Sequence, residues 1–313
     1  MDAAVHQTGE KSMLALLQRV ITCLLLGAAC GWLLYFGRSA PLLAITGFLV
    51  IALGYTAVLG AECIIAWRIN QRDPVPQPGV GQRLAAWPEE CAAAPQVFCW
   101  RQPFRPHAIA DQLEPERTRG RRGVVFIHGF FCNRGFWTPW LKRLRGSGHA
   151  FVALDLEPVF GSIDAYVPQI DDAVRRVTLA TGMPPLLVCH SMGGLAARAW
   201  LQQMRAEARV WRVVTLATPH RGTWLARFGH GDNGRQMRLL SDWLAQLDHG
   251  MPADRHTLFT CWYSNCDNIV FPASSATLPG ADNRLVPGVA HVQLAFVPQV
   301  IHATLALLDA RLP

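Results

Sequence analysis

The stretch PPLLVCHSMGGLAARAW, residues 184–200, gives the strongest indication of the fold. Two prolines precede a short apolar run, 186–189, and a pattern typical of an amphipathic helix begins directly after the turn. A buried strand that passes through a sharp turn into a helix is the context of a nucleophile elbow, which exposes a serine at the top of a sheet. We therefore predict a strand at 186–189, a helix at 192–207 and, between them, Ser191 as a nucleophile.

The turn departs from the G-x-S-x-G pattern of nucleophile elbows at one position. The strained backbone requires small residues two positions before and two positions after the serine. Gly193 meets this requirement on one side, whereas Cys189 replaces the glycine on the other, where a cysteine is small enough to be tolerated. A turn of small residues without catalytic function would look the same. The assignment of Ser191 as a nucleophile therefore requires a base, an acid and oxyanion donors elsewhere in the chain.

Short apolar runs alternate with longer amphipathic ones from residue 96 onward. This alternation is typical of an α/β fold, in which a mostly parallel sheet carries helices on both faces. The expected strands are 97–100, 124–127, 151–156, 186–189, 210–216, 258–263 and 283–286. The expected helices lie near 135–146, 164–181, 192–207 and 292–310.

The acid and the base of a hydrolase triad follow the nucleophile in the order Ser, acid, His. Asp267 comes after the expected strand 258–263, and His291 lies between the last expected strand and the last helix. Both fall where loops leave the carboxyl ends of strands, the edge at which such sheets bind ligands. The competing residues, which combine position and order less well, are Asp248, Asp254, Asp282, His249, His256 and His302. A turn-forming aspartate and a histidine that starts a helix are the alternatives to catalytic roles.

The stretch VVFIHGFFCNRGFW, residues 124–137, contains a strand that ends in His128-Gly129. The backbone amide of the residue after this glycine can turn toward a developing oxyanion, so we assign one donor to Phe130. The second donor is the amide of Met192, directly after the nucleophile. Because His128 precedes the serine on an apolar strand, we expect it to brace the loop by hydrogen bonds rather than to act as the base.

Two segments near the N-terminus are apolar enough to cross a bilayer. Residues 13–36 and 41–67 each reach the length of about 20 residues that a transmembrane helix needs, and a short turn joins them. A cleaved signal peptide would have a shorter apolar core and no second span, and a lipoprotein site at Cys30 lacks the usual leucine three residues earlier. We therefore expect a transmembrane hairpin, with buried helices of a soluble domain as the alternative.

The positive charges that flank the hairpin predict its orientation. Lys11, Arg19, Arg68 and Arg72 lie at the end shared by both termini, whereas the connecting turn carries only Arg38. Since positive flanks stay on the cytoplasmic side, we expect the C-terminal domain in the cytoplasm, at a membrane such as the bacterial inner membrane. Nine cysteines, odd in number and irregularly spaced, agree with reduced thiols rather than with a disulfide framework or a metal site.

Composition divides the chain into an anchor, a linker and a catalytic domain. Residues 1–72 hold the hairpin, the proline-rich segment 73–95 is expected to be a linker, and 96–313 form the domain with the sheet. Within that domain, 219–255 does not alternate clearly and is long for a connection, which makes it a candidate lid. The formal net charge of +7 does not indicate nucleic-acid binding, because part of it comes from 114–122, a solvated loop or a contact for anionic lipid headgroups.

Taken together, these motifs resemble those of α/β-hydrolases, in particular bacterial triacylglycerol lipases and lipase-like inositol deacylases. The resemblance covers about 96–310 and rests on HGF at 128–130, CHSMGG at 189–194, ATPHRGT at 217–223, DNIVFP at 267–272 and GVAH at 288–291. It places the nucleophile, acid and base on Ser191, Asp267 and His291, and the oxyanion donors on Phe130 and Met192. It implies acyl transfer through an acyl-enzyme without a cofactor. No residues match the aspartates of a lipase calcium site, so no metal is expected.

Aromatic residues indicate what such a site would bind. Phe131 and Trp137 follow the oxyanion strand, and Trp224 and Trp243 lie in the candidate lid. We expect them to line an apolar acyl pocket, with core packing as the alternative for each. Beside a membrane anchor this pocket favours a lipid-like ester, and neither a nucleic acid nor a protein partner is indicated. Three functions fit: a membrane-anchored esterase or lipase, an acyltransferase or thioesterase on the same fold, and an inactive membrane-anchored binding protein.

Overall fold

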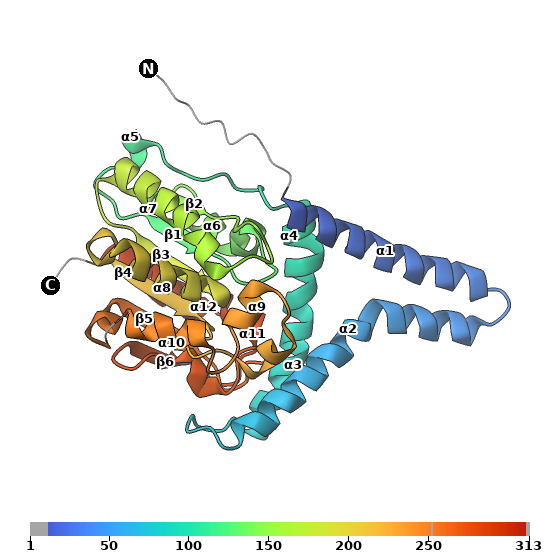
Figure 1. Ribbon diagram of the computed structural model, residues 1–313. Helices are drawn as coiled ribbons and strands as arrows, with labels where there is room; N and C mark the ends of the chain where they lie inside the picture. The colour runs from blue at the N-terminus through green and yellow to red at the C-terminus, as the bar shows by residue number, and fades with distance from the viewer. Residues whose placement is uncertain (1–11, 252, 311–313) are drawn as a thin grey trace.

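The computed structural model describes residues 12–251 and 253–310. Lys11, one of the positive residues used to predict the orientation of the hairpin, lies outside the described residues. In the described part of the chain, a six-stranded sheet forms the centre of the domain (Figure 1). The strands are β1 (Val124–Ile127), β2 (Phe151–Ala153), β3 (Leu186–His190), β4 (Arg212–Leu216), β5 (Phe259–Tyr263) and β6 (Asp282–Leu285). Their order is β2-β1-β3-β4-β5-β6, and every neighbouring pair is parallel, which confirms the predicted α/β fold.

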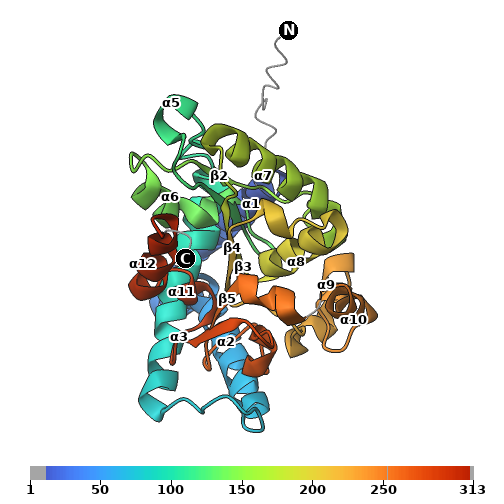
Figure 2. The ribbon, with the colours of Figure 1, turned by 90° about the vertical axis from the view of Figure 1, so that its left-hand side faces the viewer.

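Alternate residues of the strands belong to two separate hydrophobic cores. On β1, Val125 and Ile127 pack into one core and Val124 and Phe126 into the other, because successive side chains of a strand point to opposite faces. The first core lies beneath α7 (Val167–Thr181), α8 (Met192–Met204) and α10 (Asp242–His249). The second lies beneath α6 (Thr138–Leu144), α11 (His291–Leu294) and α12 (Pro298–Leu305) (Figure 2). Burial on both faces explains why the strands read as continuous apolar runs.

Two expectations for secondary structure are wrong. The strand expected at 97–100 does not form, because Gln96–Arg101 continues the preceding helix as a π-helix. At the outer edge of β2, Gln112 instead forms an isolated antiparallel bridge with Phe151. The single helix expected at 292–310 is interrupted, since Pro298 cannot continue a helix and begins α12 instead. Short helices complete the domain: α4 (Gln102–Phe104), α5 (Pro115–Thr118), α9 (Asp232–Gln236), and the turns Arg134–Trp137, Ile163–Tyr166, Glu207–Arg209, Trp224–Phe228, Ala253–Leu258, Ala273–Ala276 and Ala306–Leu308.

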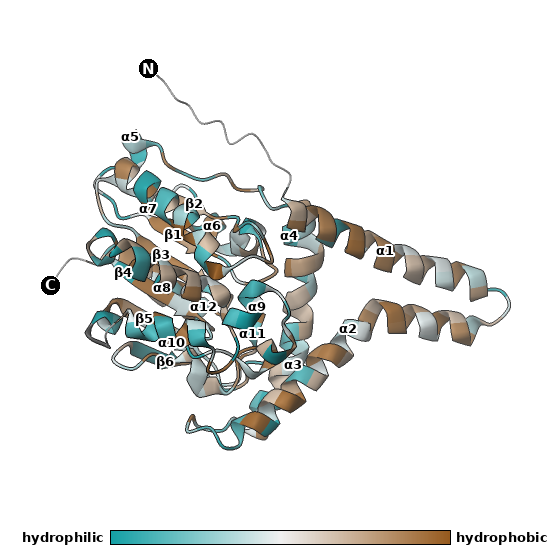
Figure 3. Ribbon diagram, viewed as in Figure 1, coloured by the Kyte–Doolittle hydropathy of each residue, from teal (hydrophilic) through white to brown (hydrophobic). Residues whose placement is uncertain are grey.

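The predicted hairpin is formed by α1 (Met13–Phe36) and α2 (Pro41–Asn70), which project from the domain (Figure 1). Both helices are long and apolar enough to cross a bilayer (Figure 3), and most of their apolar side chains are exposed. The indole of Trp32 donates to the carbonyl oxygen of Leu43 at 3.0 Å and ties the two helices together. A third segment, His291–Leu308, meets the same criteria of length and composition, but Val300 and Ile301 place it in the core of the domain.

Helix α3 (Val80–Pro95) lies in the segment that was expected to be a linker, between the hairpin and the sheet domain (Figure 1). The prolines at 74, 76 and 78 all precede it, so the segment begins as an extended turn and only then becomes helical. In the candidate lid, 219–255, the chain forms Trp224–Phe228, α9 and α10. Phe228 and Leu240 of this segment are large apolar residues that stay exposed.

Candidate active site

Ser191 lies at the sharp turn between β3 and α8. Its φ of 52° and ψ of −128° are a strained conformation for a residue with a side chain, as a nucleophile elbow requires. Two hydrogen bonds hold the turn: the amide of Ser191 donates to Leu216 at 2.8 Å, and the hydroxyl of Thr218 donates to the carbonyl oxygen of Ser191 at 2.9 Å. The end of β4 therefore supports the elbow that β3 and α8 form.

The two glycines after Ser191 allow α8 to pack directly on the ends of β1 and β4. A Cβ on Gly193 would lie 2.4 Å from the carbonyl oxygen of Ile127, and one on Gly194 would lie 2.2 Å from the hydroxyl of Thr218. Cys189, which stands where the pattern has glycine, is fully buried on β3, and its side chain is accommodated in the core that α8 covers. Burial raises the pKa of the Cys189 thiol, which keeps it protonated and inert.

Asp267 and His291 form a buried pair. The Nδ1 atom of His291 lies 3.0 Å from each carboxylate oxygen of Asp267. One of these oxygens also accepts hydrogen bonds from the amides of Ile269 and Val270, at 2.9 and 2.8 Å, which fix the orientation of the carboxylate. The imidazole also lies against His190, the residue before Ser191, with 4.7 Å between the two ring centroids. The loops after β3, β5 and β6 thus bring the predicted acid and base together beside the elbow.

The pKa of His291 is raised above its ordinary value by the carboxylates around it. Burial, the largest single effect, lowers this pKa, but the charge and the hydrogen bond of Asp267 together with the charges of Glu90 and Glu62 outweigh it. His190 faces the same ring, and burial followed by repulsion from His291 lowers its pKa well below the ordinary value, so it stays neutral. His291 is therefore the basic histidine of this pair of rings.

Three polar side chains that hold the loops of Asp267 and His291 were not predicted from the sequence: the carboxylates of Glu90 and Glu62 and the side-chain amide of Asn268. Glu90 of α3 accepts hydrogen bonds from the amides of Val292 and Gln293, at 2.9 and 3.0 Å. Asn268 accepts from the amide of His291 at 3.2 Å and donates to Glu62 of α2 at 2.8 Å. The one signal in the sequence was that Glu62 is the only charged residue in 41–67, because charged residues in apolar spans are usually functional.

Replacing Glu90 with glutamine is expected to shift the acid limb of the pH profile of kcat/KM to lower pH. The carboxylate of Glu90 raises the pKa of His291, so its removal lowers that pKa and leaves the imidazole neutral at more acidic pH. We also expect kcat/KM at high pH to fall about tenfold, which equals the ~1.4 kcal/mol of one lost buried hydrogen bond. The measurement is ester hydrolysis between pH 5 and 9.

Glu89 provides the matched control for this variant. It precedes Glu90, is exposed, and bonds only to the side chain of Gln293 among the described residues. Glu89→Gln should leave the acid limb where it is. An unmoved limb in Glu90→Gln, or equal shifts in both variants, would contradict a role of Glu90 beside His291.

The loop after β1 passes directly beside the nucleophile. A Cβ on Gly129 would lie 2.8 Å from the Cβ of Ser191, so only glycine allows this approach. His128 braces the loop as expected: its Nδ1 contacts the carbonyl oxygen of Gly129 at 2.9 Å, and its Nε2 accepts from the amide of Leu156 at 3.0 Å. Phe130 follows at once, and Met192 is the first residue of α8, so its amide has no partner within the helix.

Helix α1 of the hairpin reaches the same loop. The side-chain amide of Gln18 donates to the carbonyl oxygen of Phe131 at 3.1 Å and to the side chain of Gln102 at 3.2 Å. Gln102 in turn accepts from the amide of Asn133 at 3.0 Å. The hairpin therefore supports the site from two sides, through Gln18 at the loop after β1 and through Glu62 at the loop after β5.

Three phenylalanines form an apolar surface beside this loop. The ring of Phe160, which sequence reasoning missed, lies 5.8 Å from Phe130 and 6.4 Å from Phe131. Phe130 and Phe160 are 40% and 52% exposed, so these rings can contact an apolar ligand. Because Phe160 lies in the irregular segment before Ile163–Tyr166, no periodic pattern points to it.

The tryptophans expected to bind substrate have other surroundings. Trp137 is fully buried among Phe126 and Trp140, which favours the alternative of core packing for this residue. Trp224 stacks on Phe271 and lies beneath the guanidinium of Arg227. The indole of Trp243 donates to Asp164 at 2.8 Å, which ties α10 to the turn before α7.

Within residues 12–251 and 253–310, no group of three or more potential metal ligands is present.

Comparisons with known proteins identify the family of this chain. A model of the alpha/beta hydrolase family matches residues 124–308. Lipase BlEst2 of Bacillus licheniformis in its mature form has a similar structure, with a TM-score of 0.54 and 18% identity over 60% of this chain and 92% of that chain. Lipase B of Aspergillus fumigatus is similar with a TM-score of 0.55 and 17% identity, over 62% of this chain and 54% of that chain. A search of curated proteins gives no match.

Proposed function

Since this chain belongs to the alpha/beta hydrolase family, we propose that it is a membrane-anchored serine esterase or lipase that hydrolyses lipid-like carboxylic esters. The observation that carries the proposal is the buried pair of Asp267 and His291 beside the strained turn of Ser191. The proposed nucleophile, acid and base also follow one another along the chain in the order of the family. A strained serine next to an oriented imidazole is what acyl transfer requires, and no other buried pair within 12–251 and 253–310 adjoins such a turn.

In the proposed mechanism, the Nε2 atom of His291 takes the proton of Ser191 as the hydroxyl attacks the ester carbonyl. Asp267 holds Nδ1 and stabilises the imidazolium that forms. The amides of Phe130 and Met192 donate to the oxyanion of the tetrahedral intermediate. His291 then gives its proton to the leaving alcohol, and water, activated in the same way, releases the acid from the acyl-enzyme.

Two features support a lipid-like substrate. The exposed rings of Phe130, Phe131 and Phe160 offer an apolar surface at the proposed oxyanion loop. The hairpin provides an apolar anchor of two helices, and its contacts through Gln18 and Glu62 keep the site next to it. The two similar solved structures named above are called lipases in their descriptions.

Hydrolysis of p-nitrophenyl esters of graded acyl length tests this function. We expect kcat/KM to rise from acetate to octanoate by about 10- to 100-fold, because each buried CH₂ contributes ~0.8 kcal/mol and only part of the chain reaches the phenylalanines. A Phe160→Ser variant should flatten this rise while leaving acetate hydrolysis nearly unchanged. No hydrolysis at any length would turn the proposal toward an acyltransferase, a thioesterase or an inactive binding protein.

We place the catalytic domain, 96–313, on the cytoplasmic side of the membrane, with 219–255 as its lid. The positive flanking residues Arg19, Arg68 and Arg72 support this orientation. A pair of reporters fused after Pro313, one active only in the cytoplasm and one only outside it, tests the orientation. Activity of the second reporter alone would reverse the placement.

A further inference from the structure

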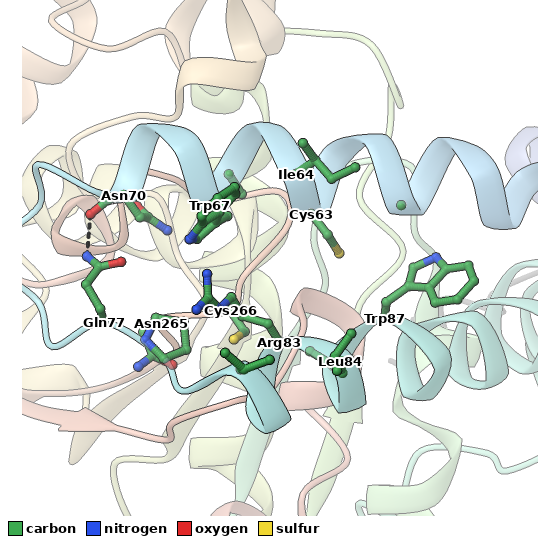
Figure 4. A pocket seen from close by; sticks show the side chains of 15 residues that line it. Cys63, Ile64, Trp67, Asn70, Gln77, Arg83, Leu84, Trp87, Asn265 and Cys266 are labelled. Carbon is green, nitrogen blue, oxygen red and sulfur yellow. Dashed lines mark hydrogen bonds between the residues drawn. The ribbon is translucent and has the colours of Figure 1, made fainter.

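A cavity of about 450 Å³ lies between α2 and α3, at the end of the hairpin that joins the sheet domain (Figure 4). This volume falls in the range of about 300–1,000 Å³ that is typical of ligand sites. The cavity is closed on the domain side by Asn265 and Cys266, which directly precede Asp267. At one end Trp87 donates to the carbonyl oxygen of Thr56 at 2.8 Å and links α3 to α2.

The chemistry of the lining suits an alkyl chain. Among the residues around the cavity, the large apolar ones are Ile64, Trp67, Val80, Leu84 and Trp87. These side chains come from both helices and form a rim that remains exposed, with Leu84 and Val80 at 71% and 65%. An exposed apolar rim on a soluble surface would be unfavourable, but this one continues the apolar surface of α2. The bilayer that surrounds the hairpin is therefore the source of whatever enters the cavity.

One cation lies in this apolar setting. The guanidinium of Arg83 extends from α3 over the ring of Trp67, at 5.1 Å from the ring centroid, and toward Cys266 (Figure 4). Among residues 12–251 and 253–310, no acidic side chain forms an ion pair with it. A guanidinium forms strong bidentate hydrogen bonds with phosphate, so its planar group is suited to an anionic headgroup at the edge of the bilayer.

We propose that this cavity binds one anionic phospholipid from the bilayer, with an acyl chain along Trp67, Leu84 and Trp87 and the phosphate on Arg83. This lipid is separate from the ester that is hydrolysed, because it lies behind the loop of Asp267 rather than at the phenylalanines near Ser191. The helix that lines the cavity also carries Glu62, next to the lining residue Cys63, and Glu62 holds Asn268. A bound lipid would thus fill the space between the hairpin and the loop that orients His291.

Native mass spectrometry of the full-length protein in detergent tests the proposal. The Ser191→Ala variant is used as the parent, so that lipid cannot be hydrolysed and the result does not depend on the proposed activity. With dioleoylphosphatidylglycerol we expect one retained lipid per chain, bound about tenfold more tightly (~1.4 kcal/mol) than dioleoylphosphatidylcholine, because the choline cation offsets the phosphate charge and repels the guanidinium of Arg83. Glycerol phosphate without acyl chains should not compete, because it cannot fill the apolar cavity.

Two substitutions separate the contributions of headgroup and chain. Arg83→Gln should remove the preference for phosphatidylglycerol, whereas Ala86→Phe, which fills the cavity from a buried lining position, should abolish retention of both lipids. Arg143→Gln removes an exposed charge on α6, away from the cavity, and should bind like the parent. Unfolding temperatures show whether each variant folds, and Arg83, being partly exposed, allows the test even if Ala86→Phe does not fold. An unchanged preference in Arg83→Gln, or no retained lipid in the parent, overturns the proposal.

Discussion

Ser191→Ala is expected to reduce kcat for ester hydrolysis by a factor on the order of 10⁶, the loss seen when a triad nucleophile is removed. The proposed acyl-enzyme cannot form without the hydroxyl, and the remaining oxyanion donors and bound water give only slow, direct hydrolysis. Folding should be little affected, because the two hydrogen bonds that hold the elbow involve the backbone of Ser191 and not its side chain. The measurements are hydrolysis of p-nitrophenyl butyrate and covalent labelling with a fluorophosphonate probe.

Ser147→Ala serves as the control for this variant. The hydroxyl of Ser147 donates to the carbonyl oxygen of Leu144 and accepts from the amide of His149, both in the loop after α6, so its loss should leave hydrolysis and labelling unchanged. Labelling that persists in Ser191→Ala and is lost in another serine variant would show that the elbow is not the nucleophile.

Asp267→Asn is expected to reduce kcat by about 10⁴-fold, because it leaves the imidazole in the wrong tautomer. One carboxylate oxygen accepts from the amides of Ile269 and Val270, and an asparagine would keep its carbonyl oxygen there. Its amino group would then face Nδ1 of His291, which would have to accept a hydrogen bond. The proton would sit on Nε2, the atom that must take the proton of the nucleophile.

The Asp267→Asn variant should also show a different pH dependence of its residual activity. The aspartate is the strongest of the groups that raise the pKa of His291, so its neutral replacement lowers that pKa and moves the acid limb of the residual activity to lower pH. Asp282→Asn is the matched control, since Asp282 on β6 pairs with Arg284 at 2.6 Å and not with a histidine. Loss of activity in Asp282→Asn but not in Asp267→Asn would reassign the acid.

The features that were predictable from the sequence are those set by local pattern. The apolar runs of the sheet locate the strands, because burial on both faces leaves no ambiguity about their centres. The pairing of Asp267 with His291 was predictable from the order of the chain together with strand ends, since parallel strands bring their carboxyl ends to one edge. The hairpin followed from length and hydropathy alone.

The features that were missed depend on contacts between distant segments. The apolar run 97–100 fits a strand or a helix equally well, and it became helical because α3 continues through it. Trp137 and Phe160 are both aromatic, and only tertiary packing decides that the first is buried and the second exposed. Glu90 precedes His291 by about 200 residues, so no local pattern connects the carboxylate with the amides of Val292 and Gln293.

The contacts of α1, α2 and α3 with the site have a consequence for where the catalyst can operate. A fragment that begins at residue 96 would lack Gln18, Glu62 and Glu90, and so would lose a support on each side of its reactive centre. If the proposed anchor is cleaved off before residue 96, we expect the released fragment to have little or no hydrolase activity. Under the proposed function, we therefore expect ester hydrolysis only from a chain that keeps α1, α2 and α3 together with the sheet domain.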